Sequence, residues 1–591
     1  MRLFVANRGE IARRVFRTCR EMGISTAAAF TEPELHCDEA DVAVQVPSFL
    51  DGPALVRAAV EAGADAVHPG YGFLSENAAF ARAVIDAGLT WIGPPPDAIE
   101  AMGSKIGAKK LMADAGVPVL TAVEGEFPLL VKASTGGGGR GLRVVRSADE
   151  LDRALAEARS EAESAFGDPS VFTEPYVEDG RHIEVQVLAD AHGRVWTLGE
   201  RECSVQRRHQ KVVEEAPSPM STLDRAALFA AAASGAKAIG YVGAGTVEFL
   251  VDRRGRFFFL EMNTRLQVEH PVTELVYGID LVRLQIEVAR GATLGDPPSP
   301  SGHAIEARLY AEDPAAGWLP QSGTLHRFEF PDGVRVDSGV SDAAFVGVTF
   351  DPMLAKVIAF GQTRNEAARK LAAALPRAKV HGLRTNRDLL VRVLRHPVFL
   401  AGEATTAFLD DATLLTPLAD EETVRLSAIA AARAIAAGHR DSGWRNVRSQ
   451  PRLRKFLEAA VEFTPVKGDT PTRIVVREGA LRRVFDVAIY GDVVEVDSAL
   501  GPVTLHRVPR FPAPAVENAA GSLLAPMPAT VVRLGVAVGD TVRKGQAVLW
   551  LEAMKMEHRI DAPADGVVTQ LNASVNQQVQ IGALLAVVEE S

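Results

Sequence analysis

Short apolar runs and amphipathic stretches alternate along the first part of the chain. The apolar runs Leu3–Ala6, Ser25–Phe30 and Ala66–His68 predict strands. Stretches with a helical spacing of apolar positions separate these runs and predict helices at Glu10–Met22 and Pro53–Ala62. Strands that alternate with helices in this way predict a parallel sheet with helices on its faces. We therefore expect an α/β domain at the N-terminus.

The pattern changes in the last third of the chain. An alanine-rich stretch at Glu421–Gly438 predicts a long helix. Alternating apolar positions at Thr472–Val476 and Val484–Tyr490 predict strands. We expect a small separate domain with one long helix over residues 420–515. Three prolines within Val508–Ala519 predict a linker at its end.

The C-terminal segment contains an internal repeat. Val538–Glu552 aligns with Val575–Glu589, and Pro526 aligns with Pro563 at the same offset. Two β-rich halves of this kind predict a flattened β-sandwich with pseudo-twofold symmetry. Glu552–Glu557 lies between the halves, where we expect a hairpin turn.

Size and composition define the broad class of protein. With 591 residues, the chain is too long for one hydrophobic core, which predicts several domains. Its hydrophobic fraction of 47% and charged fraction of 24% are those of an ordinary globular protein in water. A net charge of −11 and a pI of about 5.7 argue against nucleic acid or an anionic membrane as the main partner.

The cysteines and the apolar runs indicate the compartment. The three cysteines Cys19, Cys37 and Cys203 are too few for a disulfide framework and fit a reducing environment. We expect a packing role for Cys203, because no His/Asn arrangement that would activate a thiol is evident beside it. No apolar run approaches the roughly 20 residues of a membrane span, and no signal peptide precedes the first predicted strand. We therefore expect a cytoplasmic protein with no membrane partner.

Lys555 stands at the turn predicted between the two repeats. A lysine on a tight turn projects its ε-amine from a rigid scaffold, which suits covalent loading. An ordinary solvated lysine is the alternative, but Met554 and Met556 replace the polar residues usual in a surface loop. Ala553-Met554-Lys555-Met556 resembles the turn of the biotinyl domain, and Ala525–Pro528 matches the opening strand of that family. The resemblance implies biotin attached to Lys555.

A glycine-rich segment follows a lysine near the end of the α/β region. Lys132 precedes Gly136–Gly141 by a few residues. Glycines let successive amides approach phosphate oxygens closely, and the lysine supplies a positive charge. The segment predicts a nucleotide-binding loop that is not of the Walker A type, with a plain flexible linker as the alternative.

Two further segments strengthen the nucleotide interpretation. Glu261–Glu269 alternates strictly, and an extended chain would place its odd-numbered positions on one face. That face carries two carboxylates, two amides and a guanidinium, whose hard oxygens suit Mg²⁺; Glu248 could add a third ligand. A solvent-facing strand is the alternative. The basic run Arg201–Lys211 in an acidic protein predicts an oxyanion site.

Residues 1–415 resemble the biotin carboxylase family of ATP-grasp enzymes. The resemblance implies an N-terminal α/β domain (1–103), a part that includes the ATP-grasp lid (104–195), and central and C-terminal parts (196–415) of α+β fold. Residues 420–515 resemble the helix-plus-β linker domain that docks a carboxyltransferase subunit, and 520–591 a β-sandwich carrier domain for biotin. The segments that carry the carboxylase resemblance are Ala6–Ile11, His68–Asn77, Met102–Lys105, the glycine-rich and basic segments, Glu261–Pro271, Ala311–Pro314, Arg335–Ser338 and Phe350–Met353.

The same resemblance implies roles for individual residues. Glu269 resembles the general base that deprotonates bicarbonate, and Arg335 the cation that stabilises the enolate-like form of biotin. The bicarbonate cradle is implied at Lys211, Arg265, Gln267 and Val268, and the Mg²⁺ (or Mn²⁺) ligands at Glu248, Glu261 and Asn263. ATP contacts are implied at Lys105, Lys132, Gly136, Gly137, Gly138, Gly139, Glu174, His182, Gln206 and His209. Pro175 offers no backbone donor, so we expect adenine to be recognised through other backbone groups.

These features predict ATP- and bicarbonate-dependent carboxylation of biotin on Lys555. Transfer to an acyl-CoA is then expected from a separate carboxyltransferase β subunit, because residues 415–520 leave no room for such a domain. The same argument disfavours a pyruvate or urea carboxylase, and biotin protein ligase is the expected partner for loading.

Two alternatives stay open. The first is a carrier or scaffold whose N-terminal half has lost activity, which the short segment between Pro118 and Lys132 favours. The second is another ATP-grasp ligase, such as a carbamoyl-phosphate or D-alanine ligase, which the Ala-Met-Lys-Met turn disfavours.

Overall fold

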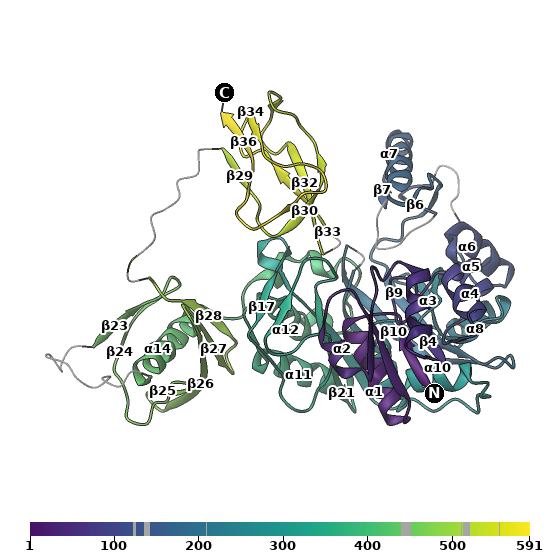
Figure 1. Cartoon of the computed structure of the whole chain (residues 1–591), viewed down its shortest axis with the longest axis horizontal. Coiled ribbons are helices and arrows are strands. Elements are labelled where there is room, and N and C mark those ends of the chain that lie inside the picture. The colour runs from purple at the N-terminus through teal and green to yellow at the C-terminus, as the bar shows by residue number, and fades with distance from the viewer. Residues whose placement is uncertain are drawn as a thin grey trace.

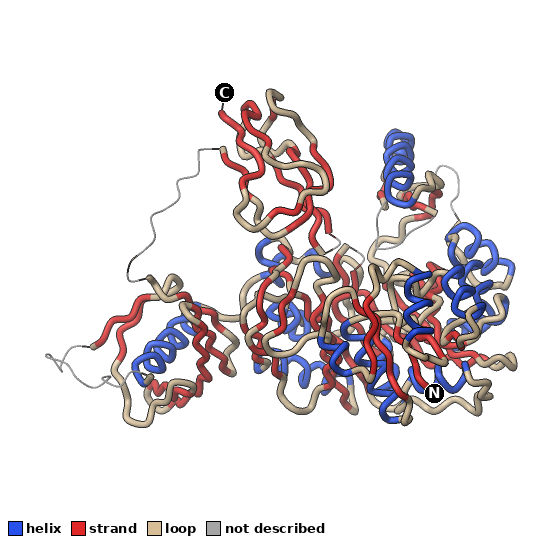
Figure 2. The backbone as a smooth tube through the Cα atoms, in the orientation of Figure 1, coloured by secondary structure: helices blue, strands red, loops and turns tan. Residues whose placement is uncertain are grey.

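The computed structural model describes residues 1–121, 126–134, 142–208, 210–438, 451–509, 511, 521–554 and 556–590. Figures 1 and 2 show a large body of helices and sheets that contains the N-terminus, a small domain around α14 on one side, and an all-strand domain that contains the C-terminus. Within the described residues, no helix is both long and apolar enough to cross a membrane.

The N-terminal part is the parallel α/β domain that the alternating pattern predicts. Its sheet has the order β3-β2-β1-β4-β5, and β1 pairs in parallel with both β2 and β4. Leu3 and Val5 pack on one face of the sheet with Ile11, while Phe4 packs on the other face, so both faces are buried. The bounds are β1 (Arg2–Val5), α1 (Gly9–Glu21), β2 (Ser25–Phe30), α2 (Leu35–Glu39), β3 (Val42–Gln45), α3 (Gly52–Glu61), β4 (Ala66–His68), α4 (Ala78–Asp86), β5 (Thr90–Trp91) and α5 (Pro96–Gly103).

A small sheet and one helix project from the body beyond α6 (Figure 1). The sheet order is β7-β6-β8, and α7 covers one face through a compact apolar cluster that includes Val131, Val145 and Ala158. Little else in the described residues packs against this cluster, so the unit has a core of its own. The bounds are α6 (Lys105–Asp114), β6 (Leu129–Ala133), β7 (Arg143–Val145), α7 (Ala148–Phe166) and β8 (Val171–Pro175).

A long antiparallel sheet forms the centre of the body, in the order β13-β12-β9-β10-β11-β14-β21-β19. It corrects one expectation, because β13 ends at Asn263 and the chain then turns into α9 instead of remaining extended to Glu269. The bounds are β9 (Arg181–Ala189), β10 (Val195–Arg207), β11 (Gln210–Ala216), α8 (Arg225–Ala238), β12 (Gly243–Val251), β13 (Phe257–Asn263), α9 (His270–Tyr277), α10 (Leu281–Ala289) and β14 (His303–Tyr310).

The rest of the body packs against one face of this sheet. Ile305 and Val357 lie in an apolar cluster with Leu371 and Leu390, which come from the two helices that cover that face. The bounds are β15 (Glu312–Asp313), β16 (Leu319–Pro320), β17 (Gly323–Leu325), β18 (Arg327–Glu329), β19 (Arg335–Ser338), β20 (Ala344–Val346), β21 (Met353–Gly361), α11 (Arg364–Ala374), β22 (Lys379–His381), α12 (Arg387–Arg395) and α13 (Pro397–Leu400).

The small domain consists of a long helix and the sheet that wraps it. Asp420 caps the helix by accepting a hydrogen bond from the Thr423 amide, and the alanines of α14 let the strands approach it closely. The domain contacts the body where His381 Nε2 lies 2.7 Å from Asp497 Oδ2. The bounds are α14 (Glu421–Ala437), β23 (Arg452–Lys455), β24 (Ala460–Phe463), β25 (Arg473–Glu478), β26 (Leu481–Tyr490), β27 (Val493–Ser498) and β28 (Val503–His506).

The C-terminal domain is a sandwich of two sheets, in the orders β29-β36-β34-β31 and β33-β32-β30-β35. Each strand of one sheet corresponds to a strand of the other at the offset seen in the sequence, which confirms the predicted pseudo-twofold repeat. The ladder between β32 and β33 closes with Ala553 opposite Met556, at the predicted hairpin. The bounds are β29 (Ser522–Leu524), β30 (Ala529–Leu534), β31 (Thr541–Val542), β32 (Ala547–Ala553), β33 (Met556–Asp561), β34 (Gly566–Leu571), β35 (Gln578–Val579) and β36 (Leu584–Glu590).

Candidate active site

A cavity of about 2200 Å³ opens between the projecting β6–β8 unit, the central sheet and the C-terminal hairpin. Cationic and anionic side chains from distant parts of the chain converge on it. Most of the residues that the sequence singled out line this cavity: Lys105, Lys132, Glu174, His182, Gln206, Lys211, Glu248, Glu261, Asn263, Arg265, Gln267, Val268 and Glu269. Gly136–Gly139, His209 and Lys555 lie outside the described residues.

Arg335 does not line the cavity. It lies on the edge strand β19, where Nη1 donates to Glu274 at 2.8 Å and Nη2 donates to Asp337 at 2.7 Å. Arg308 lines the cavity instead, with Nη2 3.0 Å from Glu269 Oε2. The structure thus pairs Arg335 with two buried carboxylates, and its role toward biotin stays a prediction.

Lys211 is the centre of the anionic part of the site. Its Nζ lies 2.6 Å from Glu184, 3.0 Å from Glu248 and 2.6 Å from Glu269. Burial alone would lower the lysine pKa, but the three carboxylates outweigh it and raise the pKa well above its usual value. Lys211 is therefore a fixed positive charge inside the cavity.

Glu269 comes at the start of α9, where the chain turns after β13. Oε1 accepts from Lys211 and Oε2 accepts from Arg308, so both oxygens have cationic partners. Burial would raise the Glu269 pKa, but Lys211, Arg308 and Arg201 together hold it below its ordinary value. The group is an ionised carboxylate, and an anion bound beside it will make it a stronger base by like-charge repulsion.

A second pair of carboxylates faces the cavity from β12 and β13. Glu248 and Glu261 are opposite each other in the ladder, and Asn263 Nδ2 donates to Glu248 Oε1 at 2.9 Å. Burial and then the negative charge of Glu248 raise the Glu261 pKa, so a cation between the two would relieve a real repulsion. Carboxylate and amide oxygens are the ligands that Mg²⁺ prefers, and this donor set fits that ion.

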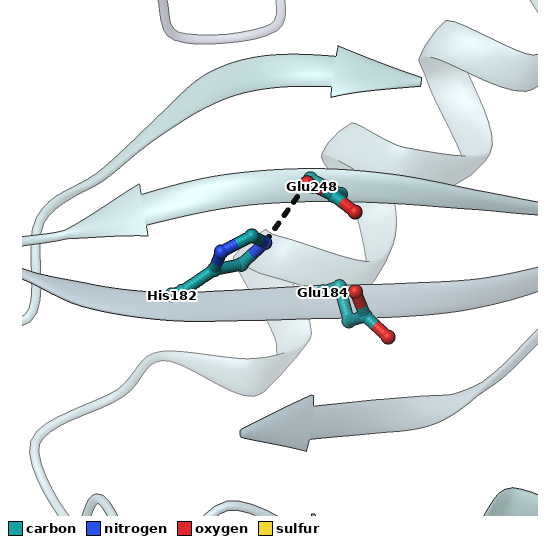
Figure 3. Close-up of side chains that lie close together, drawn as sticks. All are labelled: His182, Glu184 and Glu248. Carbon is teal, nitrogen blue, oxygen red and sulfur yellow. Dashed lines mark ion pairs between the residues drawn. The ribbon is translucent and has the colours of Figure 1, made fainter. Parts of the chain in front are cut away.

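His182 and Glu184 extend this cluster along β9 (Figure 3). His182 Nε2 lies 2.9 Å from Glu248 Oε2. Burial would lower the His182 pKa, but Glu248 outweighs it and raises the pKa. The histidine is therefore a partner of the carboxylate that lies opposite Glu261 in the ladder.

The other end of the cavity is cationic. Lys109 and Lys132 both contact Glu174, at 2.6 Å and 2.5 Å. Burial opposes ionisation of Glu174, but Lys132 and Lys109 outweigh it and lower the Glu174 pKa. Phosphate oxygens would compete with one carboxylate for two ammonium groups here, and Lys105 lines the same region.

Arg201 contacts two of the side chains around the cavity, Glu184 and Gln267. The sequence placed it in a basic run that predicts an oxyanion site, yet its side chain is fully buried. It donates to Gln267 Oε1 at 2.9 Å and to Glu184, which leaves the amide of Gln267 directed at Glu248, 2.8 Å away. Cys203 is fully buried nearby and burial raises its pKa, in keeping with a packing role.

The C-terminal hairpin closes one side of the cavity. The Met554 amide donates to the Val348 carbonyl at 2.8 Å, and its side chain is 2% exposed within the apolar cluster of the body. Leu319 and Val348 in turn pack against the core of the C-terminal domain. Val532, Arg533 and Glu557 of this domain line the cavity beside the charged groups. The hairpin therefore lies against this charged cavity.

Family profiles match four successive segments of the chain and leave residues 412–520 unmatched. They are described as biotin carboxylase N-terminal domain (residues 1–99), carbamoyl-phosphate synthase L chain ATP-binding domain (101–296), biotin carboxylase C-terminal domain (306–411) and biotin-requiring enzyme (521–588). Together with the cavity and the sandwich, these matches define an ATP-grasp biotin carboxylase joined to a biotinyl domain.

Relatives of similar length define the class of protein more closely. Methylcrotonoyl-CoA carboxylase subunit alpha of Dictyostelium discoideum is 38% identical over 99% of the chain and 95% of its own length. Propionyl-CoA carboxylase alpha chain of Ruegeria pomeroyi is 37% identical over 98% of each chain. The chain belongs to the family of α subunits of biotin-dependent acyl-CoA carboxylases.

A solved structure supports the ligands of the carboxylase part. The biotin carboxylase domain of Hydrogenobacter thermophilus 2-oxoglutarate carboxylase, in complex with MgADP, ADP and bicarbonate, superposes with a TM-score of 0.68 and 40% identity. The match covers 70% of this chain and 98% of that one. Biotin, ATP and Mg²⁺ are accordingly the cofactors and nucleotide of this class, as the sequence predicted.

Proposed function

We propose that this chain carboxylates biotin carried on its own Lys555, and that a separate carboxyltransferase subunit then transfers the carboxyl group to an acyl-CoA. The observation that carries the proposal is the biotinyl hairpin seated against a cavity that contains Lys211, Glu269 and the Glu248–Glu261 pair. The carbon of bicarbonate is a poor electrophile until ATP activates it. Positioning of the reactants and neutralisation of their charges therefore dominate catalysis. The bound biotin supplies the ureido nitrogen that accepts the carboxyl group.

Each part of the cavity has a proposed task in this reaction. Lys105, Lys132 and the glycine-rich segment hold phosphate oxygens, while Glu248, Glu261 and Asn263 hold Mg²⁺. Lys211, Arg265, Gln267 and Val268 bind bicarbonate, and Glu269 takes its proton. Arg335 is the proposed cation that stabilises negative charge on the biotin ring, and Arg308 holds the Glu269 carboxylate in place. The remaining proposed ATP contacts are Gly136–Gly139, Glu174, His182, Gln206 and His209.

The test of this function is bicarbonate-dependent ADP release by the purified, biotin-loaded chain, followed by a panel of acyl-CoAs with the co-purified carboxyltransferase. We expect ADP release to require bicarbonate and Mg²⁺ and to increase with added free biotin. An inactive carrier or scaffold would release no ADP. If ADP is released but no acyl-CoA accepts labelled carbon, the biotin carboxylase activity is supported and the proposal of an acyl-CoA acceptor is wrong.

The contact between the hairpin domain and the body gives a prediction that distinguishes carboxylation of tethered biotin from carboxylation of free biotin. Leu319 packs against the C-terminal domain outside the charged cavity, so Leu319→Ala removes apolar contact and leaves the catalytic groups in place. We expect carboxylation of the tethered biotin to slow about tenfold, because burying a leucine contributes about 1.5–3 kcal/mol. The measurement is single-turnover incorporation of labelled bicarbonate into the protein, with the rate on free biotin measured in parallel.

Phe345→Ala is the matched control for this variant. Phe345 is large, apolar and 72% exposed on the neighbouring strand β20, where its loss removes little packing. Both variants should carboxylate free biotin at the rate of the unmodified chain. Equal loss on free and tethered biotin in Leu319→Ala would show a general defect and contradict the seating argument.

A further inference from the structure

Two glutamates lie directly beneath Arg308 and have no part in the reaction described above. Glu214 of β11 and Glu306 of β14 are opposite each other in the antiparallel ladder, and neither side chain has measurable exposure. Directly opposed residues have Cβ atoms about 5 Å apart on the same face of the sheet, so the two carboxyl groups are within reach of each other. If both carboxyl groups were ionised, their negative charges would repel each other in a buried site, so one of them must be protonated or paired with a cation.

Most oxygens of the pair have no hydrogen-bond donor in the part of the chain that the structure describes. Among the described residues, Glu214 Oε2 and both carboxyl oxygens of Glu306 are buried without a partner. Burial and the neighbouring Glu214 raise the Glu306 pKa well above its usual value, with Lys356 opposing them. Burial also raises the Glu214 pKa, to about 7, against the opposing charge of Arg308. Two such carboxyls satisfy each other when one carries a proton and donates it to its neighbour.

The ionised member of the pair is in contact with Arg308. Arg308 Nη2 lies 2.5 Å from Glu214 Oε1, and the same nitrogen lies 3.0 Å from Glu269 Oε2. The guanidinium thus bridges a carboxylate on the sheet and the carboxylate proposed as the general base. Glu306, two residues before Arg308 on β14, shares its face of the strand.

We propose that Glu214 and Glu306 form one proton-sharing carboxyl pair whose single negative charge holds the Arg308 guanidinium in place beside Glu269. Glu306 carries the shared proton and Glu214 carries the charge. Both are positioning residues that act through Arg308, and the inference rests on the function proposed for Arg308 and Glu269. Without the charge on Glu214, the Arg308 guanidinium keeps its ion pair with Glu269 and loses the one with Glu214, so its position is less fixed.

The surroundings determine how the pair titrates. Arg308 and Lys211 favour the ionised form of Glu214, whereas Glu269 disfavours it. The groups that face the pair are Arg308 and Tyr310 on β14, Lys211 on β11, Lys356 on β21, Glu269 at the start of α9 and Tyr71 after β4. Protonation of Glu214 below about pH 7 removes the single negative charge, so the contribution of the pair is present above that pH and lost below it.

Glu214→Gln in the full-length, biotin-loaded chain tests the charge. We expect kcat for carboxylation of free biotin to fall about tenfold, because a hydrogen bond between charged groups becomes one to a neutral amide. The KM for ATP should stay close to that of the unmodified chain, since the phosphate end of the cavity is untouched. The part of the decline in kcat below pH 7 that belongs to Glu214 should be absent from the variant.

Glu215→Gln is the structural control. Glu215 is the next residue of the same strand, is equally buried and pairs with His303 and Arg364 on the opposite face. This variant also breaks a buried ion pair, so it should lower the melting temperature while leaving kcat and its pH dependence unchanged. A fall in kcat that is equal in both variants would mean general destabilisation and would overturn the proposal.

Substitutions of Glu306 test the shared proton. The amide of Glu306→Gln can still donate to Glu214, so this variant should retain most of kcat, whereas Glu306→Leu cannot donate and should approach Glu214→Gln. Equal activity of the two Glu306 variants contradicts the pair. If the unmodified chain itself carboxylates no biotin, the proposed function fails instead, and these comparisons distinguish the two results.

Discussion

Lys555→Arg is expected to abolish incorporation of labelled bicarbonate into the protein, while carboxylation of free biotin continues. Arginine keeps the positive charge and length of the side chain, but its delocalised guanidinium cannot replace the lysine amine in the amide link to biotin. The cavity residues are unchanged, so bicarbonate-dependent ATP cleavage with added biotin should proceed. Mass spectrometry of the C-terminal peptide and label retained on the protein give the two measurements.

Lys544→Arg is the matched control, because Lys544 lies in the same domain with its amide bonded to Asp565 and away from the hairpin. This variant should be loaded with biotin and carboxylated like the unmodified chain. Loss of free-biotin carboxylation in Lys555→Arg would contradict the separation of carrier and catalytic parts.

Glu269→Gln is expected to lower kcat by about 10²–10⁴-fold, the range for loss of a positioned general base. The amide has the same shape but cannot take a proton from bicarbonate, and it leaves Lys211 and Arg308 with less negative charge to contact. ADP release with saturating ATP, bicarbonate and biotin measures the loss. Binding of ATP, followed separately by equilibrium titration, should change little.

Asp280→Asn provides the comparison next to the same helix. Asp280 lies three residues beyond the end of α9 and pairs with Arg14 outside the cavity. Its replacement should cost stability and leave the catalytic rate near that of the unmodified chain. A comparable loss of kcat in both variants would argue that Glu269 acts through the stability of α9 and not as a base.

Local patterns were sufficient to predict the architecture. The strand at Ser25–Phe30 and the helix that begins at Glu421 follow directly from apolar periodicity, because both elements bury one continuous set of side chains. The C-terminal repeat was equally informative, since β30 and β34 occupy equivalent places in the two sheets. The same pattern of buried positions in the two halves leads to the same strand pairing in the two sheets.

The site was harder to predict where the chain bends or where charge is buried. Strict alternation at Glu261–Glu269 suggested an extended strand, yet the chain turns after Asn263 and still delivers Gln267 and Glu269 to the cavity. Arg335 lies in a matching motif, but its cationic group is held by Glu274 and Asp337, a tertiary pairing that sequence spacing cannot reveal. The role predicted for Arg335 stays a prediction, whereas its partners Glu274 and Asp337 could not be found from the sequence.

Arg308 was missed although its strand carried a signal. In His303–Tyr310 every side chain is buried, and Glu306 and Arg308 are charged residues in that otherwise apolar run. Buried charges are costly unless paired, so two of them on one face of a central strand indicate an ionic network there. Glu184 on β9 is a further buried charge, next to the buried amide of Gln186.

The geometry of the C-terminal sandwich also separates its hairpin from the end at which the domain joins the chain. The first and last strands, β29 and β36, are neighbours, and the Gly521 carbonyl accepts from the Val588 amide, so both chain ends meet at one extremity. The hairpin is at the other extremity, as Figure 1 shows. A seven-residue strand such as β32 spans about 23 Å. The sandwich thus holds the hairpin about 23 Å from the end at which the domain joins the rest of the chain.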